Sequence, residues 1–127
     1  MEKTRIQTDH APAPIGPYSQ GIAAGDFVFC SGQAAVDPAA GKLIEGDVAA
    51  QTRRTLDNLK AVLEQGGSDL AHVVKTTVFL ADMADFRAMN EVYAAYFTGT
   101  PPARSTVAVK ALPLGALVEI EALAIRR

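Results

Sequence analysis

The chain has 127 residues, of which 49% are hydrophobic and 20% are charged. These proportions exclude a disordered or fibrous protein and predict one globular domain spanning residues 1–127. The formal net charge of −2, from twelve Lys and Arg against fourteen Asp and Glu, argues against a nucleic-acid partner, which would require concentrated positive charge.

The sequence contains neither a signal peptide nor an apolar run of roughly 20 residues, so we expect a cytoplasmic protein with no membrane partner. The single cysteine, Cys30, excludes a disulfide within the chain and fits a reducing compartment. It ends the apolar run Phe27–Cys30, where a free cysteine is more often a small buried hydrophobe than a nucleophile.

The first forty residues predict a loop followed by short strands. The proline-rich segment 11–17 predicts an ordered loop. Residues 19–23 and 27–31 then predict two strands joined as a hairpin across Gly25. Asp37–Pro38 and Gly41 mark the next turn.

The middle of the chain predicts a helix, a strand and a second helix. After Asp47, apolar residues recur at helical spacing, and Asp47 suits the N-cap because its carboxylate can accept a free N–H of the first turn. Gly66–Gly67 supplies the left-handed residue that ends many helices. Residues 73–80 are rich in β-branched side chains and predict a strand, and residues 85–97 predict the second helix.

The last part of the chain alternates in a two-residue rhythm. Residues 104–110 and 117–125 flank the turn-prone segment 112–115, which predicts a terminal hairpin. The resulting order β-β-β-α-β-α-β-β indicates an α+β fold with two helices packed on one face of a sheet. The other face of the sheet would need a partner, so we expect an oligomer.

Arg104 is the most informative charged residue, because it opens an apolar, β-branched strand. Its planar fork of N–H donors matches a carboxylate, so it could anchor a small carboxylic acid. A structural ion pair with Glu119 or Glu121 is the alternative interpretation.

Two glutamates of the last strand lie on an otherwise apolar face. Glu119 and Glu121 share that face with Leu123 and Ile125, because strand side chains repeat every two residues. Loss of hydration would raise the pKa of a carboxyl there, whereas a nearby arginine would lower it, so the sequence leaves the direction open.

The common signatures of nucleotide, zinc and nucleophilic chemistry are absent. His10 and His72 are far apart in sequence and have no cysteine or carboxylate cluster around them, so we expect no metal site. We interpret each of them as a histidine that lies at the surface or caps a helix.

Several segments, in this order and spread over nearly the whole chain, resemble the RidA/YjgF family. The four most specific are Ile15-Gly16-Pro17-Tyr18-Ser19-Gln20, Ser31-Gly32-Gln33, Pro102-Ala103-Arg104-Ser105 and Val118-Glu119-Ile120-Glu121-Ala122. Segments 47–52, 74–78 and 85–86 are also similar. The resemblance implies a chorismate-mutase-like fold assembled as a homotrimer, with sites between subunits.

The resemblance further implies hydrolysis of 2-aminoacrylate and 2-iminobutanoate to 2-keto acids and ammonia, without a cofactor. Arg104 matches the residue that binds the substrate carboxylate, and Glu121 matches the residue that positions the attacking water. The remaining matches line the pocket, with the backbone of the last beside the imine nitrogen: Tyr18, Ser31, Gly32, Asn90 and Thr106. Many family members have cysteine where Thr106 stands.

Two other functions compete with deamination. The family has been associated with ribonuclease or translation-inhibitor activity, which would need a basic groove and an acid/base pair. A non-catalytic ligand-binding module or holdase is the other alternative. The presence of both Arg104 and Glu121 favours catalysis.

Overall fold

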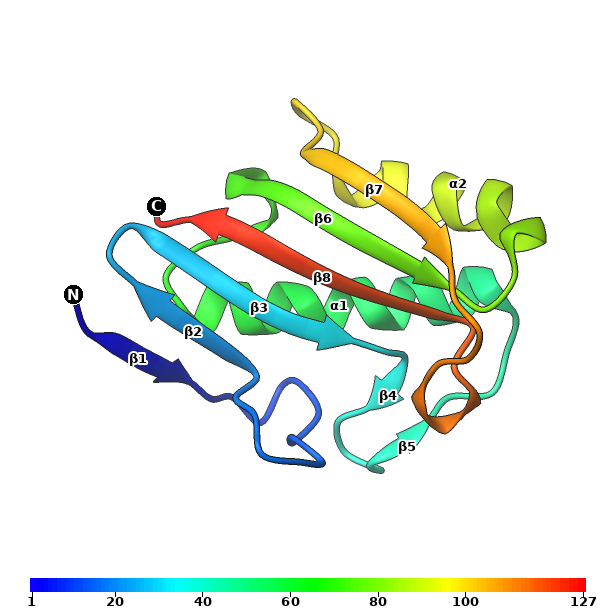
Figure 1. Cartoon of the computed structure of the whole chain (residues 1–127), viewed down its shortest axis with the longest axis horizontal. Helices are drawn as coiled ribbons and strands as arrows, with labels where there is room; N and C mark the ends of the chain where they lie inside the picture. The colour runs from blue at the N-terminus through cyan, green and yellow to red at the C-terminus, as the bar shows by residue number, and fades with distance from the viewer.

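The alternation of buried and exposed side chains in the strands produces a sheet with one covered and one open face. In a computed structural model of residues 1–127, this six-stranded sheet has the order β1-β2-β3-β8-β6-β7. Its pairs are antiparallel except β6 and β7, which are parallel. Both helices lie behind the sheet in Figure 1, which gives an α+β fold.

The bounds of the elements are as follows. The strands of the main sheet are β1 (Lys3–Ile6), β2 (Gly21–Ala24), β3 (Phe27–Gln33), β6 (Val73–Leu80), β7 (Ala103–Ala108) and β8 (Val118–Ile125). The helices are α1 (Val48–Gln65) and α2 (Phe86–Tyr96), and the short strands β4 (Val36–Asp37) and β5 (Lys42–Leu43) form a separate hairpin. Three single turns of 3₁₀ helix are η1 (Leu70–His72), η2 (Met83–Asp85) and η3 (Pro113–Gly115).

The core lies between the helices and the covered face of the sheet. Its fully buried apolar side chains come mainly from α1, β6 and β8, and include Leu56, Leu59, Val62, Leu63, Val78, Leu80, Val118, Ile120 and Ala124. Burying a leucine or valine side chain contributes roughly 1.5–3 kcal/mol. The apolar stripe of α1 is therefore what holds the long helix to the sheet.

Most of the predicted local signals are confirmed. The β2–β3 hairpin turns at Gly25, whose φ of +56° lies in the left-handed region that favours glycine. The Asp47 carboxylate accepts the Ala50 N–H at 3.0 Å and caps α1. The left-handed residue after α1 is Gly67, with φ +84°.

The predicted terminal hairpin is wrong. β7 and β8 do not pair with each other, because β6 lies between them and pairs with both. The chain passes from β6 through α2 into the parallel strand β7, and the segment after β7 then brings β8 back to the other side of β6. Strand β1 was also not predicted: three of its four residues are exposed, so it carries little apolar periodicity.

The open face of the sheet carries large apolar side chains. Phe27, Phe29, Val107 and Ile125 are each exposed by 39–47% of their surface. A face of this kind is typical of a protein that associates with a partner. Neither helix is both long and apolar enough to cross a membrane.

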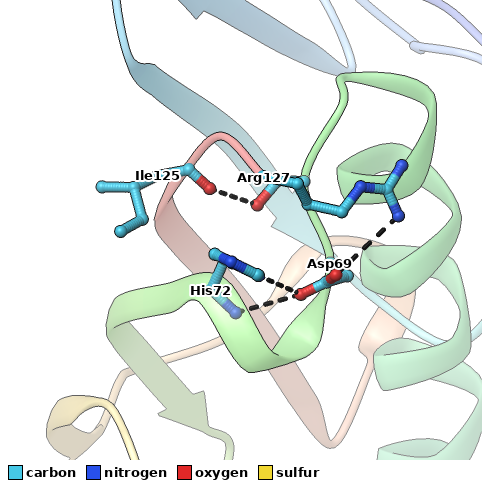
Figure 2. A network of polar contacts seen from close by, with 5 residues as sticks. Asp69, His72, Ile125 and Arg127 are labelled. Atoms are coloured by element: carbon cyan, nitrogen blue, oxygen red, sulfur yellow. Dashed lines mark hydrogen bonds and ion pairs between the residues drawn. The ribbon is translucent and has the colours of Figure 1, made fainter.

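Polar contacts around η1 tie the end of β8 to the loop after α1 (Figure 2). The Asp69 carboxylate accepts the His72 backbone N–H at 3.1 Å, contacts His72 Nδ1 at 2.6 Å and lies 3.8 Å from the Arg127 guanidinium. The hydroxyl of Ser68 donates to the carbonyl of Ile125 at 2.6 Å. The hydrogen bond with His72 is the main cause that lowers the pKa of Asp69.

We expect Asp69→Ala to lower the free energy of unfolding at neutral pH by about 1 kcal/mol, because a helix-turn cap is lost. A carboxyl whose folded-state pKa is lowered stabilises the fold above the ordinary value of 3.8. This contribution is lost as pH falls below 3.8 and through the lowered pKa. The difference from wild type should therefore shrink in urea titrations below about pH 4. Asp69→Asn is the matched control, since it keeps a capping oxygen, and a loss as large as that of Asp69→Ala would contradict the capping role.

Candidate active site

Arg104 lies on the edge strand β7 and points toward the helices. In the β6–β7 register it is paired with Thr76, a fully buried residue of the helix-covered face. Its guanidinium carbon is 4.8 Å from the ring centroid of Tyr93 and 5.6 Å from that of Phe86, both on α2. An arginine over such rings gains roughly 0.5–2 kcal/mol of cation–π attraction while its N–H donors remain free for an anion.

Contacts with two other side chains hold the Tyr93 ring in place under Arg104. The Tyr93 hydroxyl is 2.6 Å from the Thr76 hydroxyl, and its ring lies 4.5 Å from that of Phe97. Burial raises the pKa of Tyr93, so the phenol stays protonated in this contact. The guanidinium therefore rests on a rigid surface.

Two polar atoms near this part of the fold have no partner. Thr106 is two residues beyond Arg104 on β7 and so faces the same side. Asn90 lies on α2 between Phe86 and Tyr93 at helical spacing. Thr106 Oγ1 and Asn90 Oδ1 are both buried and make no hydrogen bond. Thr55 Oγ1 on α1 is a third buried atom without a partner, and buried polar atoms are nearly always satisfied in folded proteins.

A second group of predicted residues gathers on the opposite face of the sheet, around the central strands β3 and β8. Tyr18 and Gly32 line a cavity of about 280 Å³ together with Glu119. The neighbouring Ser31 donates its hydroxyl to the Ser19 carbonyl at 2.6 Å, which fixes the Tyr18 loop to β3.

The Glu119 carboxylate lies directly over the backbone of Gly32. A Cβ at position 32 would stand 2.6 Å from Glu119 Oε2, so glycine leaves the space that the carboxylate occupies. Loss of hydration raises the pKa of Glu119, and the negative charge of Glu121 raises it further. The direction that the sequence left open is therefore upward, and the group is suited to exchanging a proton with water.

Glu121 has a different environment on the same face. The prediction that it shares this face with Glu119 is confirmed by the alternating burial of β8. It is exposed, is paired with Thr77, and lines a shallow depression with Tyr18 and Ser31. Its predicted role in positioning water stays a prediction. Glu119 lies closer to Gly32 and is the carboxylate that sequence reasoning did not select.

The two groups of residues do not meet within one chain. Arg104 is in register with Thr76, whereas Glu121 is in register with the next residue, Thr77, so the two side chains emerge on opposite faces. The cavities lined by Tyr18 do not include Arg104. The alternative interpretation, a structural ion pair of Arg104 with Glu119 or Glu121, is therefore contradicted within one chain.

Other candidate residues are accounted for by the fold. Cys30 is buried, and this raises its pKa to about 12, which keeps the thiol protonated and unreactive. His72 contacts the Asp69 carboxylate that caps η1. His10 is exposed in the loop after β1, which confirms the interpretation as a surface histidine.

Comparison with known proteins identifies the family. The family model described as Endoribonuclease L-PSP matches residues 8–126. The chain is 49% identical over 130 residues to the 2-iminobutanoate/2-iminopropanoate deaminase of Escherichia coli, with 100% of both chains covered. The crystal structure of the E. coli YjgF gene product matches with a TM-score of 0.93 and 48% identity, covering 98% of this chain and 99% of that one. The chain belongs to the RidA/YjgF family.

Other relatives show how similar RidA/YjgF proteins are over this length. The chain is 53% identical over 127 residues to the protein DfrA of Myxococcus xanthus, covering 98% of this chain and 97% of the relative. The structure of RidA from an Antarctic Psychrobacter species matches with a TM-score of 0.93 and 44% identity, covering 96% of this chain and 98% of that one. Both matches extend over nearly the whole chain, so the α+β fold is shared along its length.

The raised pKa of Glu119 predicts that this residue destabilises the fold at neutral pH. A carboxyl whose folded-state pKa is raised above the ordinary 4.5 stabilises the fold below that value, and this contribution is lost as pH rises through the raised pKa. Glu119→Gln should therefore raise Tm at pH 7 by about 1–3 °C, with no gain near pH 4. Calorimetry at both pH values would measure this.

Glu121→Gln is the matched control for that experiment. It removes only the negative charge of Glu121, the smaller of the two causes that raise the pKa of Glu119. The increase in Tm at pH 7 should therefore be smaller than that of Glu119→Gln. Equal Tm values for wild type and Glu119→Gln across this pH range would contradict a desolvated Glu119.

Proposed function

We propose that this RidA/YjgF protein hydrolyses reactive 2-imino acids and their enamine tautomers, such as 2-iminobutanoate and 2-aminoacrylate, to 2-keto acids and ammonia. The observation that carries the proposal is Arg104, a fixed guanidinium with no carboxylate partner in its own chain. The deaminases of E. coli and mouse, 49% and 48% identical to this chain, support the reaction type.

Binding of the substrate begins with its carboxylate. The Arg104 fork donates two parallel N–H bonds to the two carboxylate oxygens, which fixes the orientation of the acid as well as its position. Because the imine is already electrophilic at C2, orientation beside a water molecule contributes much of the rate.

Hydrolysis then needs one proton carrier. Glu119 is the group best suited, because burial raises its pKa and so makes it a better proton acceptor than an exposed carboxylate. The imine enters protonated on nitrogen. The water oxygen bonds to C2, one water proton passes to the Glu119 carboxylate, and the C=N π pair moves to nitrogen. In the resulting carbinolamine Glu119 returns this proton to nitrogen, the C–N bond breaks, and the hydroxyl proton leaves as the C=O bond forms, so ammonia and a proton are released with no change in oxidation state overall.

We further propose that the site forms between subunits of a homotrimer, as the family resemblance implies. The Arg104 group and the Glu119 group lie on opposite faces of the sheet, so a neighbouring chain must supply one of them. The open sheet face with Phe27, Phe29 and Ile125 provides the apolar surface for such an assembly.

The central test competes the protein against a chemical trap. Threonine dehydratase acting on threonine releases the imine, semicarbazide captures what remains free, and 2-ketobutyrate is measured. Wild type should divert the imine to keto acid. Arg104→Ala should lower kcat/KM about 100-fold, and Arg104→Lys should recover only part, since an ammonium cannot make the two-pronged contact.

The glutamates provide an internal comparison in the same assay. Glu119→Gln should lower kcat while leaving binding of the product-like 2-ketobutyrate intact, whereas Glu121→Gln should retain most activity. The reverse result would restore the role that the sequence predicted for Glu121. An unchanged semicarbazone yield with wild-type protein, for imines derived from threonine and serine alike, would exclude the deaminase function.

A subunit-mixing experiment tests the shared site. Arg104→Ala and Glu119→Gln chains are co-expressed in equal amounts with different tags, and the mixed oligomers are purified and sized by light scattering. In a cyclic trimer with shared sites, each purified mixed trimer restores one of its three sites, because a site needs Arg104 from one chain and Glu119 from the next. If each site lay within one chain, every chain would carry a lesion and the mixture would stay inactive.

A further inference from the structure

Leu114 adopts a backbone conformation that leucine rarely takes. It is the one non-glycine residue with positive φ, at φ 62° and ψ 12°, in the middle of η3. A Cβ in this left-handed region lies too close to the following carbonyl oxygen, so glycine or asparagine is the usual choice. The side chain is also 59% exposed, which is unfavourable for an apolar residue.

The surrounding contacts hold Leu114 in this conformation. The Ala116 N–H donates to the Pro113 carbonyl at 3.2 Å, and the Leu117 N–H donates to the buried Gln51 side chain at 2.9 Å. The turn is therefore anchored on both sides of the strained residue. Strain that is maintained in this way is found most often at ligand-binding sites.

The Leu114 side chain lines the cavity that contains the proposed proton carrier. Glu119, Gly32 and Tyr18 form its polar part, and Leu114 and Pro113 line it from the η3 side. An apolar side chain at this position stands beside the place where the remainder of the substrate, beyond its C=N group, would lie.

We propose that Leu114 determines substrate specificity by limiting the size of the side chain at C3 of the imino acid. The inference rests on the proposed function and adds the residue that limits which 2-imino acids the site accepts. Larger imines, with a branched or aromatic group at C3, would overlap the leucine side chain. The left-handed turn at Leu114 forms part of the cavity lining.

The test measures selectivity between a small and a large imine. A broad-specificity L-amino-acid oxidase, supplied with catalase, generates the imines of 2-aminobutyrate and phenylalanine, and the semicarbazide trap reports how much of each is hydrolysed. Leu114→Gly should raise kcat/KM for the phenylalanine imine relative to the aminobutyrate imine by about tenfold or more, since pocket volume discriminates by such factors. Hydrolysis of the small imine should change little.

Leu114→Asn is the matched control, because asparagine tolerates the left-handed conformation but keeps a branched side chain of similar size. It should preserve the preference for the small imine. A relaxed preference in both variants would assign the effect to the backbone and overturn the proposal. An unchanged ratio in Leu114→Gly, with trimer and Tm retained, would also overturn it.

Failure of the proposed function itself gives a different result. In that case wild-type protein would hydrolyse neither imine, and no ratio could be formed. Selectivity that is present in wild type and unaffected by Leu114→Gly would leave the deaminase reaction intact and assign size discrimination to another residue.

Discussion

The position of β8 between β3 and β6 constrains both the core and the candidate site. One face of β8 presents Val118, Ile120, Ala122 and Ala124 to the helices, and the other presents two carboxylates beside apolar side chains. A slip of one residue in register would bury both carboxylates and expose the core positions, so the hydrophobic effect fixes this register strongly. The location of Glu119 is thus a consequence of how the core packs.

The same alternation explains why one chain carries two separate halves of a site. Arg104 faces the helices from the edge strand, where aromatic rings support the guanidinium without neutralising it. Glu119 faces away from the helices, where the loss of hydration raises its pKa. Within one chain the arginine is therefore separated from the glutamate, and the two groups meet only in the shared site proposed above.

Local features of the fold could be predicted from the sequence, whereas long-range ones could not. Asp47, Gly25 and Gly67 act on their immediate neighbours, so their signals in the sequence were sufficient. The insertion of β6 between β7 and β8 depends on the α2 crossover. Two segments with alternating apolar and polar residues on either side of a turn have the same sequence pattern whether or not the two strands pair.

The choice between the two glutamates could not be made from sequence either. Alternation places both on one face, but which of them lies over Gly32 depends on the register between β3 and β8. That register shifts between Cys30 and Gln33, where β3 uses one residue more than β8. A bulge of this kind follows from tertiary packing, and the segment Ser31-Gly32-Gln33 contains no pattern that predicts it.

The central place of β8 also has a consequence for how the protein folds. Phe27 pairs with Ile125, so the contact between β3 and β8 joins segments from opposite ends of the 127-residue sequence. Until β8 docks, the inner edges of β3 and β6 have unpaired N–H and C=O groups flanked by β-branched and aromatic side chains. Pairings of such long sequence separation form slowly, and exposed strand edges pair readily with other chains. We therefore infer that the partly folded chain, rather than the native sheet, is the species most prone to aggregate.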